Sequence, residues 1–157
     1  MLPTAHLAVT IILWSILDSY VGCDMLSLFL AVLFGVFIDI DAIVLKSMHR
    51  QSILHSFLFW IIVLTVGYLV RIPYYWTPIF AMIHIALDSI DWGVYALYPI
   101  SKKCFGLRMM AKKSSLLPGK NSIMDFVKEY FSCRPLVAFE IVSSIIAAII
   151  FVYKFMI

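Results

Sequence analysis

The chain has few charged residues and no strict alternation of polar and apolar residues. Charged residues make up 13% of its 157 positions, whereas 64% are hydrophobic and the mean hydropathy is +1.03. So few polar side chains cannot cover the surface of a water-soluble domain of this size, which argues against a soluble globule. The lack of alternation argues against a transmembrane barrel, whose strands face lipid and lumen in turn. We therefore predict an all-α membrane protein, because a helix satisfies its own backbone polar groups.

Cysteine is also scarce. The three cysteines, Cys23, Cys104 and Cys133, are an odd number without close spacing. They fit neither a disulfide framework nor a thiolate zinc site, so we predict reduced thiols.

Five apolar segments are long enough to be read as membrane spans, for which about 20 mostly apolar residues are needed. We expect one membrane-embedded domain over residues 1–157. The predicted spans are residues 5–21, 25–45, 53–70, 79–98 and 136–155.

Lysine and arginine are distributed unevenly between the two sides that five spans create. Eight of the twelve lie between Lys102 and Arg134, in the predicted loop 101–134, whereas the opposite side holds only Arg71 and Lys154. The positive-inside rule therefore predicts a multi-pass protein of the cell membrane. Its N-terminus and basic loop would lie in the cytoplasm and its C-terminus outside.

Within the basic loop, residues 122–131 place Ile123, Phe126, Val127 and Tyr130 at helical spacing. This pattern predicts one short amphipathic helix at the cytoplasmic interface. The basic character suits anionic lipid headgroups, and a soluble protein partner could also dock there; the simpler alternative is a topology signal alone. Direct nucleic-acid binding is not expected.

Ionisable residues are frequent in the predicted spans, where each costs a few kcal/mol unless it has a partner, a wet cavity or a bound ion. Cations are too few in the spans to neutralise the acids, and a metal would supply the missing positive charge. The acids and histidines concerned are Asp18, Asp39, Asp41, Asp88, Asp91, Glu140, His6, His49, His55 and His84.

Two spacings indicate ligands for one ion. His84 and Asp88 are one helical turn apart on the same face, as two ligands of one metal require. Asp39 and Asp41 would be splayed by about 200° in a regular helix, so both reach one site only where the helix ends or unwinds. The alternative for these two aspartates is pairing with a cation of the following loop.

The predicted topology brings these residues to the cytoplasmic side. Six or seven candidates exceed the needs of one zinc ion, so two metals sharing an aspartate are conceivable. We predict metal ligation by His6, Asp39, Asp41, His49, His55, His84 and Asp88. Arg50 and Asp91 complete the predicted site as catalytic residues, Arg50 to grip anionic oxygens and Asp91 as general base.

The same residues also form a pattern of ordered blocks over residues 4–101. The blocks are Thr4-Ala5-His6, Asp39-Ile40-Asp41, His49-Arg50 with His55-Ser56, and His84 through Ser89, running on through Gly93 to Leu97-Tyr98-Pro99-Ile100-Ser101. In these blocks the sequence resembles the YdjM-like family of inner-membrane-associated, metal-dependent hydrolases, described as LexA-binding. The resemblance implies a membrane-bound hydrolase with a metal cofactor. More distantly, the His and acid at i and i+4 are similar to the pattern in zinc-dependent phospholipase C.

The leading prediction is a metal-dependent hydrolase in which water activated by zinc, as one or two ions, attacks a phosphoester or lipid-like substrate. Two alternatives stay open. One is an ion- or proton-coupled transporter or channel, in which Asp18 and Glu140 would extend a path across the membrane. The other is a non-catalytic membrane protein that is stabilised by its metal.

Overall fold

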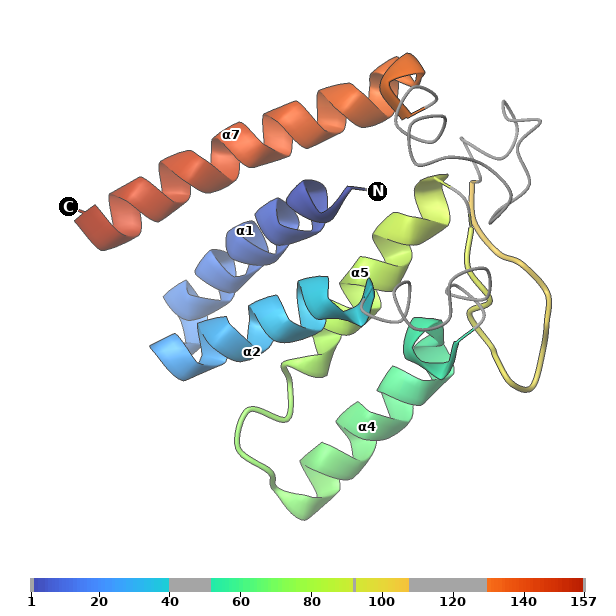
Figure 1. The fold of residues 1–157 in the computed structure, drawn as a ribbon. Helices are drawn as coiled ribbons and strands as arrows, with labels where there is room; N and C mark the ends of the chain where they lie inside the picture. Colours follow the sequence, from blue (N-terminus) through green and yellow to red (C-terminus); the bar gives the residue numbers. More distant parts are fainter. Residues whose placement is uncertain (1, 40–51, 92, 108–129, 157) are drawn as a thin grey trace.

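The computed structural model describes residues 2–39, 52–91, 93–107 and 130–156 (Figure 1). Within these ranges every regular element is helical, apart from an isolated bridge between Val94 and Phe105. The predicted all-α class is therefore confirmed for the described residues. The helices are α1 (Pro3–Val21), α2 (Met25–Val36), α4 (Phe57–Val70), α5 (Pro78–Asp91) and α7 (Arg134–Met156), with single 3-10 turns η1 (Phe37–Asp39) and η3 (Ile53–His55).

Local sequence explains the tight connection between α1 and α2. Helix α1 ends at Gly22, whose φ of 65° is the left-handed conformation that glycine adopts without strain. Asp24 then caps α2: its carboxylate accepts the N–H of Ser27 at 2.8 Å, and the Ser27 hydroxyl accepts the N–H of Asp24 at 3.1 Å. The two helices consequently form an antiparallel hairpin.

Helices α4 and α5 form a second hairpin, joined by residues 71–77. Because both hairpins reverse the chain, the starts of α1, α4 and α7 lie at the same end of the bundle as the ends of α2 and α5 (Figure 1). We call this the site end. Helix α7 packs along α1, α2 packs against α1 and α5, and α4 packs against α5.

Among the described residues, two helices, α1 with 19 residues and α7 with 23, are long and apolar enough to cross a membrane by length and composition. The other three are shorter than the predicted spans. Helix α2 has 12 residues, and α4 and α5 have 14 each. At 1.5 Å per residue they extend about 18–21 Å, against about 30 Å for a hydrocarbon core.

The shortening occurs at the site end. Helix α4 begins at Phe57, after η3, and not at residue 53. Helix α5 ends at Asp91 and not near residue 98, because Gly93 takes a φ of 86° and its N–H bonds to the carbonyl of Asp88 at 3.2 Å. The predicted count of five spans therefore stays a prediction.

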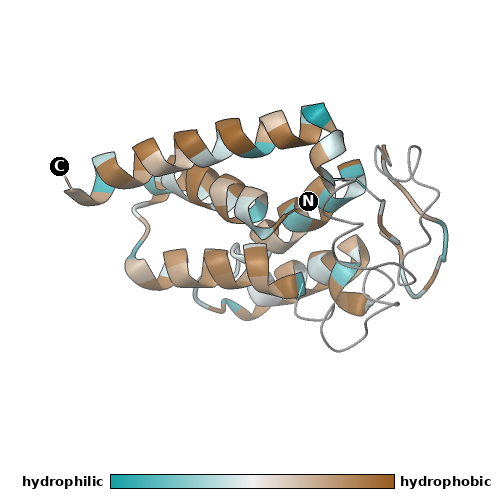
Figure 2. Ribbon diagram, turned by 45° about the horizontal axis from the view of Figure 1, so that its top comes forward, coloured by the Kyte–Doolittle hydropathy of each residue, from teal (hydrophilic) through white to brown (hydrophobic). Residues whose placement is uncertain are grey.

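Much apolar surface faces outward. In Figure 2 hydrophobic residues cover most of the length of the helices, and in α7 the side chains of Ile141, Val142 and Ile145 are each 55% exposed. The buried core is made of small clusters between helices, such as Trp14, Ala31 and Phe80. Helix α7 thus buries only part of its apolar surface within the described molecule.

Candidate metal centre

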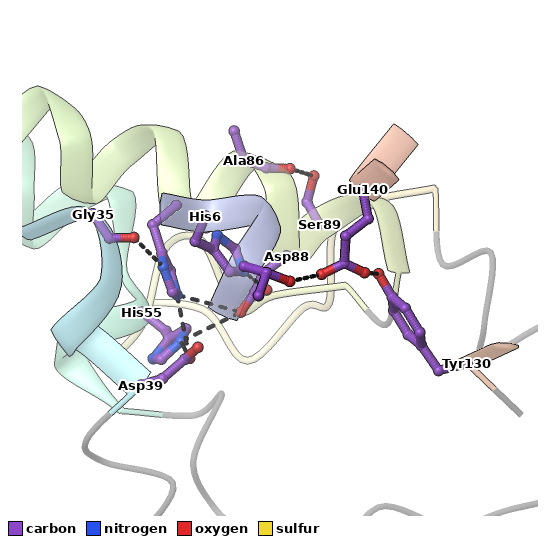
Figure 3. A network of polar contacts seen from close by, with 11 residues as sticks. His6, Gly35, Asp39, His55, Ala86, Asp88, Ser89, Tyr130 and Glu140 are labelled. Carbon is purple, nitrogen blue, oxygen red and sulfur yellow. Dashed lines mark hydrogen bonds and ion pairs between the residues drawn. The ribbon is translucent and has the colours of Figure 1, made fainter. Parts of the chain in front are cut away.

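Four of the predicted ligands meet at the site end. Asp39 comes from η1, His55 from η3, and His84 and Asp88 from α5; their ligand atoms all lie within 4.8 Å of one another (Figure 3). The three α5 and η3 side chains are buried, while the Asp39 side chain is 27% exposed. Helix α2 ends at Val36, and Asp39 lies in the 3-10 turn that follows it, in keeping with the predicted break in the second segment.

The separations between imidazole and carboxylate suit a shared cation. His55 Nε2 lies 3.4 Å from Asp39 Oδ1 and 3.5 Å from Asp88 Oδ2, and His84 Nε2 lies 3.2 Å and 3.6 Å from the same two oxygens. Ideal N–H···O hydrogen bonds are shorter, about 2.9–3.0 Å. A tetrahedron with bonds of about 2.0–2.1 Å has edges of about 3.3–3.4 Å. The four N–O separations are thus close to those of a tetrahedral metal site, and the group could hold a metal ion.

The orientation of His84 strengthens this fit. Its Nδ1 lies 2.9 Å from the carbonyl oxygen of Gly35. A carbonyl only accepts, so Nδ1 must carry the proton, and in a neutral ring Nε2 then presents a lone pair. That lone pair faces two carboxylates, an arrangement that a proton or a metal cation at Nε2 would relieve. A backbone carbonyl on the second nitrogen is the usual support of a metal-binding histidine.

Close packing places the Gly35 carbonyl. A Cβ at Gly35 would lie 2.1 Å from Oγ1 of Thr10. Only glycine at this position therefore lets α1 and α2 approach so closely. This contact brings the α2 backbone within reach of the His84 ring. Gly35 was not among the predicted site residues, because its only signal in the sequence is a glycine inside an apolar run, four residues before Asp39.

His55 is held by the short turn on which it lies. Its Nδ1 is 3.4 Å from the hydroxyl of Ser52. The indole N–H of Trp60 donates to the carbonyl of Leu54 at 2.7 Å, which ties η3 to the first turn of α4. The ring is fully buried, so its Nε2 is directed toward Asp39 and Asp88 with little freedom.

His6 adds a third imidazole beside the group of four. Its Nε2 lies 3.2 Å from Asp88 Oδ1, and its ring stacks on that of His84 with centroids 4.0 Å apart. Asp88 thus faces His6 with one oxygen, and His55 and His84 with the other. A carboxylate in this position could bridge two cations.

The other predicted site residues either lie outside the group of four or fall outside the described residues. Asp91 is fully buried on α5, one turn beyond Asp88, but is not a member of the group of four. Asp41, His49 and Arg50 lie outside the described residues, so their predicted roles stay predictions. Of the predicted amphipathic helix 122–131, the structure describes only residues 130 and 131, which are helical.

Comparisons of the chain with protein-family models, curated proteins and solved structures give no match. The site is consequently defined by its own geometry. Asp39, His55, His84 and Asp88 form a group of two imidazoles and two carboxylates that could hold a metal ion.

Proposed function

We propose that this protein is a membrane-embedded, metal-dependent hydrolase related to the YdjM-like family. Its metal would be held by Asp39, His55, His84 and Asp88. The observation that carries the proposal is the His84 ring, because Nδ1 is committed to the Gly35 carbonyl while Nε2 faces both carboxylates. A divalent cation among these atoms would neutralise the two aspartates and bind the lone pair of His84 Nε2.

Zinc is the ion we propose, since imidazole together with carboxylate suits it. When bound, it would polarise a phosphoester and make water a nucleophile near neutral pH. A second ion could be held by His6 and by Oδ1 of Asp88, the oxygen that faces His6. Asp39 is the most exposed of the four ligands, so substrate would approach from its side. Asp91 would accept the proton of the attacking water, and Arg50 would bind the anionic oxygens.

We further propose that α1, α2, α4, α5 and α7 are all embedded in the membrane. The exposed apolar side chains of α7 support this setting, and local thinning of the bilayer would accommodate the three shorter helices. The N-terminus and the basic loop 101–134 would lie in the cytoplasm, the loop against anionic headgroups, and the C-terminus outside. A phosphoester or lipid-like substrate fits a site that opens at this interface.

Metal content tests the centre directly. The protein is purified in detergent and analysed for bound elements as wild type, His84→Ala and Asp88→Ala. We expect zinc in wild type and none above background in the two variants. Asp18→Asn is the matched control, because this aspartate lies on α1 but pairs with Lys154 at the opposite end of the bundle. Metal-free wild type that takes up no added zinc would contradict the proposal and favour proton-coupled transport.

Hydrolysis is tested separately from binding. Zinc-loaded protein is assayed with phosphomonoesters, phosphodiesters and phospholipids in mixed micelles. We expect turnover that a chelator abolishes and zinc restores. Asp91→Asn should keep its zinc and lose most of its activity, since Asp91 lies outside the group of four. Full zinc with no turnover on any of these esters would point to the metal-stabilised, non-catalytic alternative.

Two native cysteines test the orientation. Cys23 follows α1, whereas Cys104 lies in the basic loop, and the proposed topology puts them on opposite sides. In the Cys104→Ser variant, an impermeant maleimide should label Cys23 on intact cells. In the Cys23→Ser variant, Cys104 should be labelled only after permeabilisation. Labelling of both cysteines from the same side would contradict the five-span arrangement.

A further inference from the structure

Helix α1 carries His6 in its first turn but has no cap of its own. The N-cap residue is Leu2, whose side chain cannot accept a hydrogen bond from the free N–H groups of that turn. A polar contact from the other end of the sequence instead holds the side chain of Thr4 in this turn. Thr4 Oγ1 donates to Oε1 of Glu140 on α7, and the Tyr130 hydroxyl donates to Oε2 of the same carboxylate at 2.6 Å (Figure 3).

Glu140 is a buried carboxylate on α7, and burying its charge costs free energy that its contacts must offset. It lies in a mostly apolar helix and is only 8% exposed, and within the described ranges it forms no ion pair with lysine or arginine. Two hydroxyl donors and the positive end of the α1 dipole compensate part of the cost of burying its charge. A leucine at this position would avoid that cost altogether.

Tyr130 completes the contact. Its ring is fully buried, and its oxygen also takes a hydrogen bond from the backbone of Leu2. Burial, and after it the hydrogen bond to Glu140, raises the pKa of Tyr130, so the phenol remains a donor at neutral pH. We call Thr4, Tyr130 and Glu140 the Glu140 clamp.

The clamp packs against the sequence neighbours of both His6 and Asp88. Tyr130 packs in one buried cluster with Ala5 and Leu87. Ala5 immediately precedes His6 on α1, and Leu87 immediately precedes Asp88 on α5. Any movement of the first turn of α1 away from α5 would therefore have to break the clamp or open this cluster.

We propose that Glu140 and Tyr130 are positioning residues of the metal centre. Glu140 binds Thr4 in the first turn of α1, Tyr130 binds Glu140 and packs with Ala5 and Leu87, and together they hold His6 against Asp88 and His84. This inference rests on the proposed metal function. It assigns to the last helix, which provides no ligand to the group of four, a role in setting the affinity of the site.

The main competing explanation is that Glu140 merely fastens α7 to α1. The same helix pair contains a suitable control at its other end. There Lys154 pairs with Asp18, and its Nζ lies 4.5 Å from the centroid of the Trp14 ring. Lys154→Met removes a polar α1–α7 contact far from His6, so it reports on fastening alone.

The experiment uses the full chain in detergent as wild type, Glu140→Gln, Tyr130→Phe and Lys154→Met. Cobalt(II) titration followed by visible absorption gives the affinity and the coordination spectrum. Amide hydrogen-exchange rates of metal-free protein measure how readily the helix unfolds locally at residues 4–7. For Glu140→Gln and Tyr130→Phe we expect about 10–100-fold weaker cobalt binding, an altered spectrum and faster exchange in the first turn. Lys154→Met should lower the melting temperature and leave cobalt binding and first-turn exchange unchanged.

If both clamp variants bind cobalt as tightly as Lys154→Met does, the positioning role is overturned and Glu140 is a fastener. If wild type itself binds no cobalt, the proposed metal centre fails, and hydrogen exchange still decides whether the clamp holds the first turn. Tyr130→Phe removes a single oxygen, so it remains informative if Glu140→Gln does not fold.

Discussion

The Nδ1 atom of His84 lies 2.9 Å from the carbonyl oxygen of Gly35, and this contact joins the two helical hairpins at the candidate metal centre. It fixes both the rotation of the ring and the nitrogen that bears the proton. The position of this carbonyl depends on the close approach of α1 to α2 at Gly35, where a Cβ would overlap Thr10. Helix packing several residues away thus determines which ring nitrogen faces the carboxylates.

Gly35→Ala should therefore impair metal binding although Gly35 is not a ligand. The new Cβ would overlap Thr10, and overpacking of this kind costs about 1–3 kcal/mol of unfolding free energy. The α2 backbone must shift to relieve the overlap, so the hydrogen bond to His84 weakens. Cobalt affinity and the melting temperature measure the two effects.

Gly67→Ala is the control for this prediction. A Cβ there would lie 3.2 Å from the Cβ of Tyr75, a tight contact at the opposite end of the bundle. It should lower stability and leave cobalt affinity at the wild-type value. Equal affinities in Gly35→Ala and wild type would show that the Gly35 carbonyl does not orient His84.

His6→Ala should weaken the centre without abolishing it. His6 contacts Asp88 through Oδ1, whereas His55 and His84 lie near Oδ2. The group of four thus survives the substitution, and we expect one equivalent of zinc to remain with affinity reduced about tenfold. Elemental analysis and competition with a chelator measure both quantities. Complete loss of zinc would make His6 a ligand as essential as His84.

Part of this site follows from the sequence because it depends on local spacing. His84 and Asp88 are one turn apart, and any helix places them together. The gathering of Asp39 and His55 with them followed from placing acids and histidines at one end of successive apolar segments. That argument needs only chain reversal between segments, which Gly22, Asp24 and Pro78 support locally.

Other features could not be read from the sequence because they depend on contacts between distant segments. The carbonyl of Gly35 matters only once Thr10 packs on that glycine, and the partners of Glu140 are 10 and 136 residues away. The end of α5 was missed for a related reason. Apolar residues continue through Val94 and Leu97, so the hydropathy pattern gives no sign that the helix ends before the turn at Gly93.

The pair formed by Asp24 and Tyr74 should make stability depend on pH at the end opposite the site. The hydrogen bond from the Tyr74 hydroxyl, and next the N–H of Ser27, lower the pKa of Asp24 from its ordinary value of 3.8. A lowered folded-state pKa stabilises the protein above that ordinary value, and the contribution is lost as the pH falls through the lowered pKa. Tyr74→Phe should therefore melt below wild type at pH 7.

The difference in melting temperature between wild type and Tyr74→Phe should shrink as the pH falls below 3.8. Metal-free protein is used, so that ligand protonation does not enter the comparison. Tyr20→Phe serves as control, because the Tyr20 side chain is 84% exposed. A difference that stays constant from pH 7 to acid would mean that Asp24 is not the acceptor that matters.

Trp60→Phe should weaken metal binding through η3. The Trp60 indole donates to the carbonyl of Leu54, the residue before His55, and loss of such a partly buried hydrogen bond costs about 1 kcal/mol. The turn would then hold His55 less firmly, so we expect cobalt affinity to fall about tenfold.

Trp14→Phe removes a comparable indole hydrogen bond, to Ser27 at 3.0 Å, at the far end of the bundle. The two variants should lose similar stability in thermal unfolding, yet only Trp60→Phe should lose cobalt affinity. Equal affinities in both would mean that His55 is positioned by its own packing and not by the bond that fastens its turn.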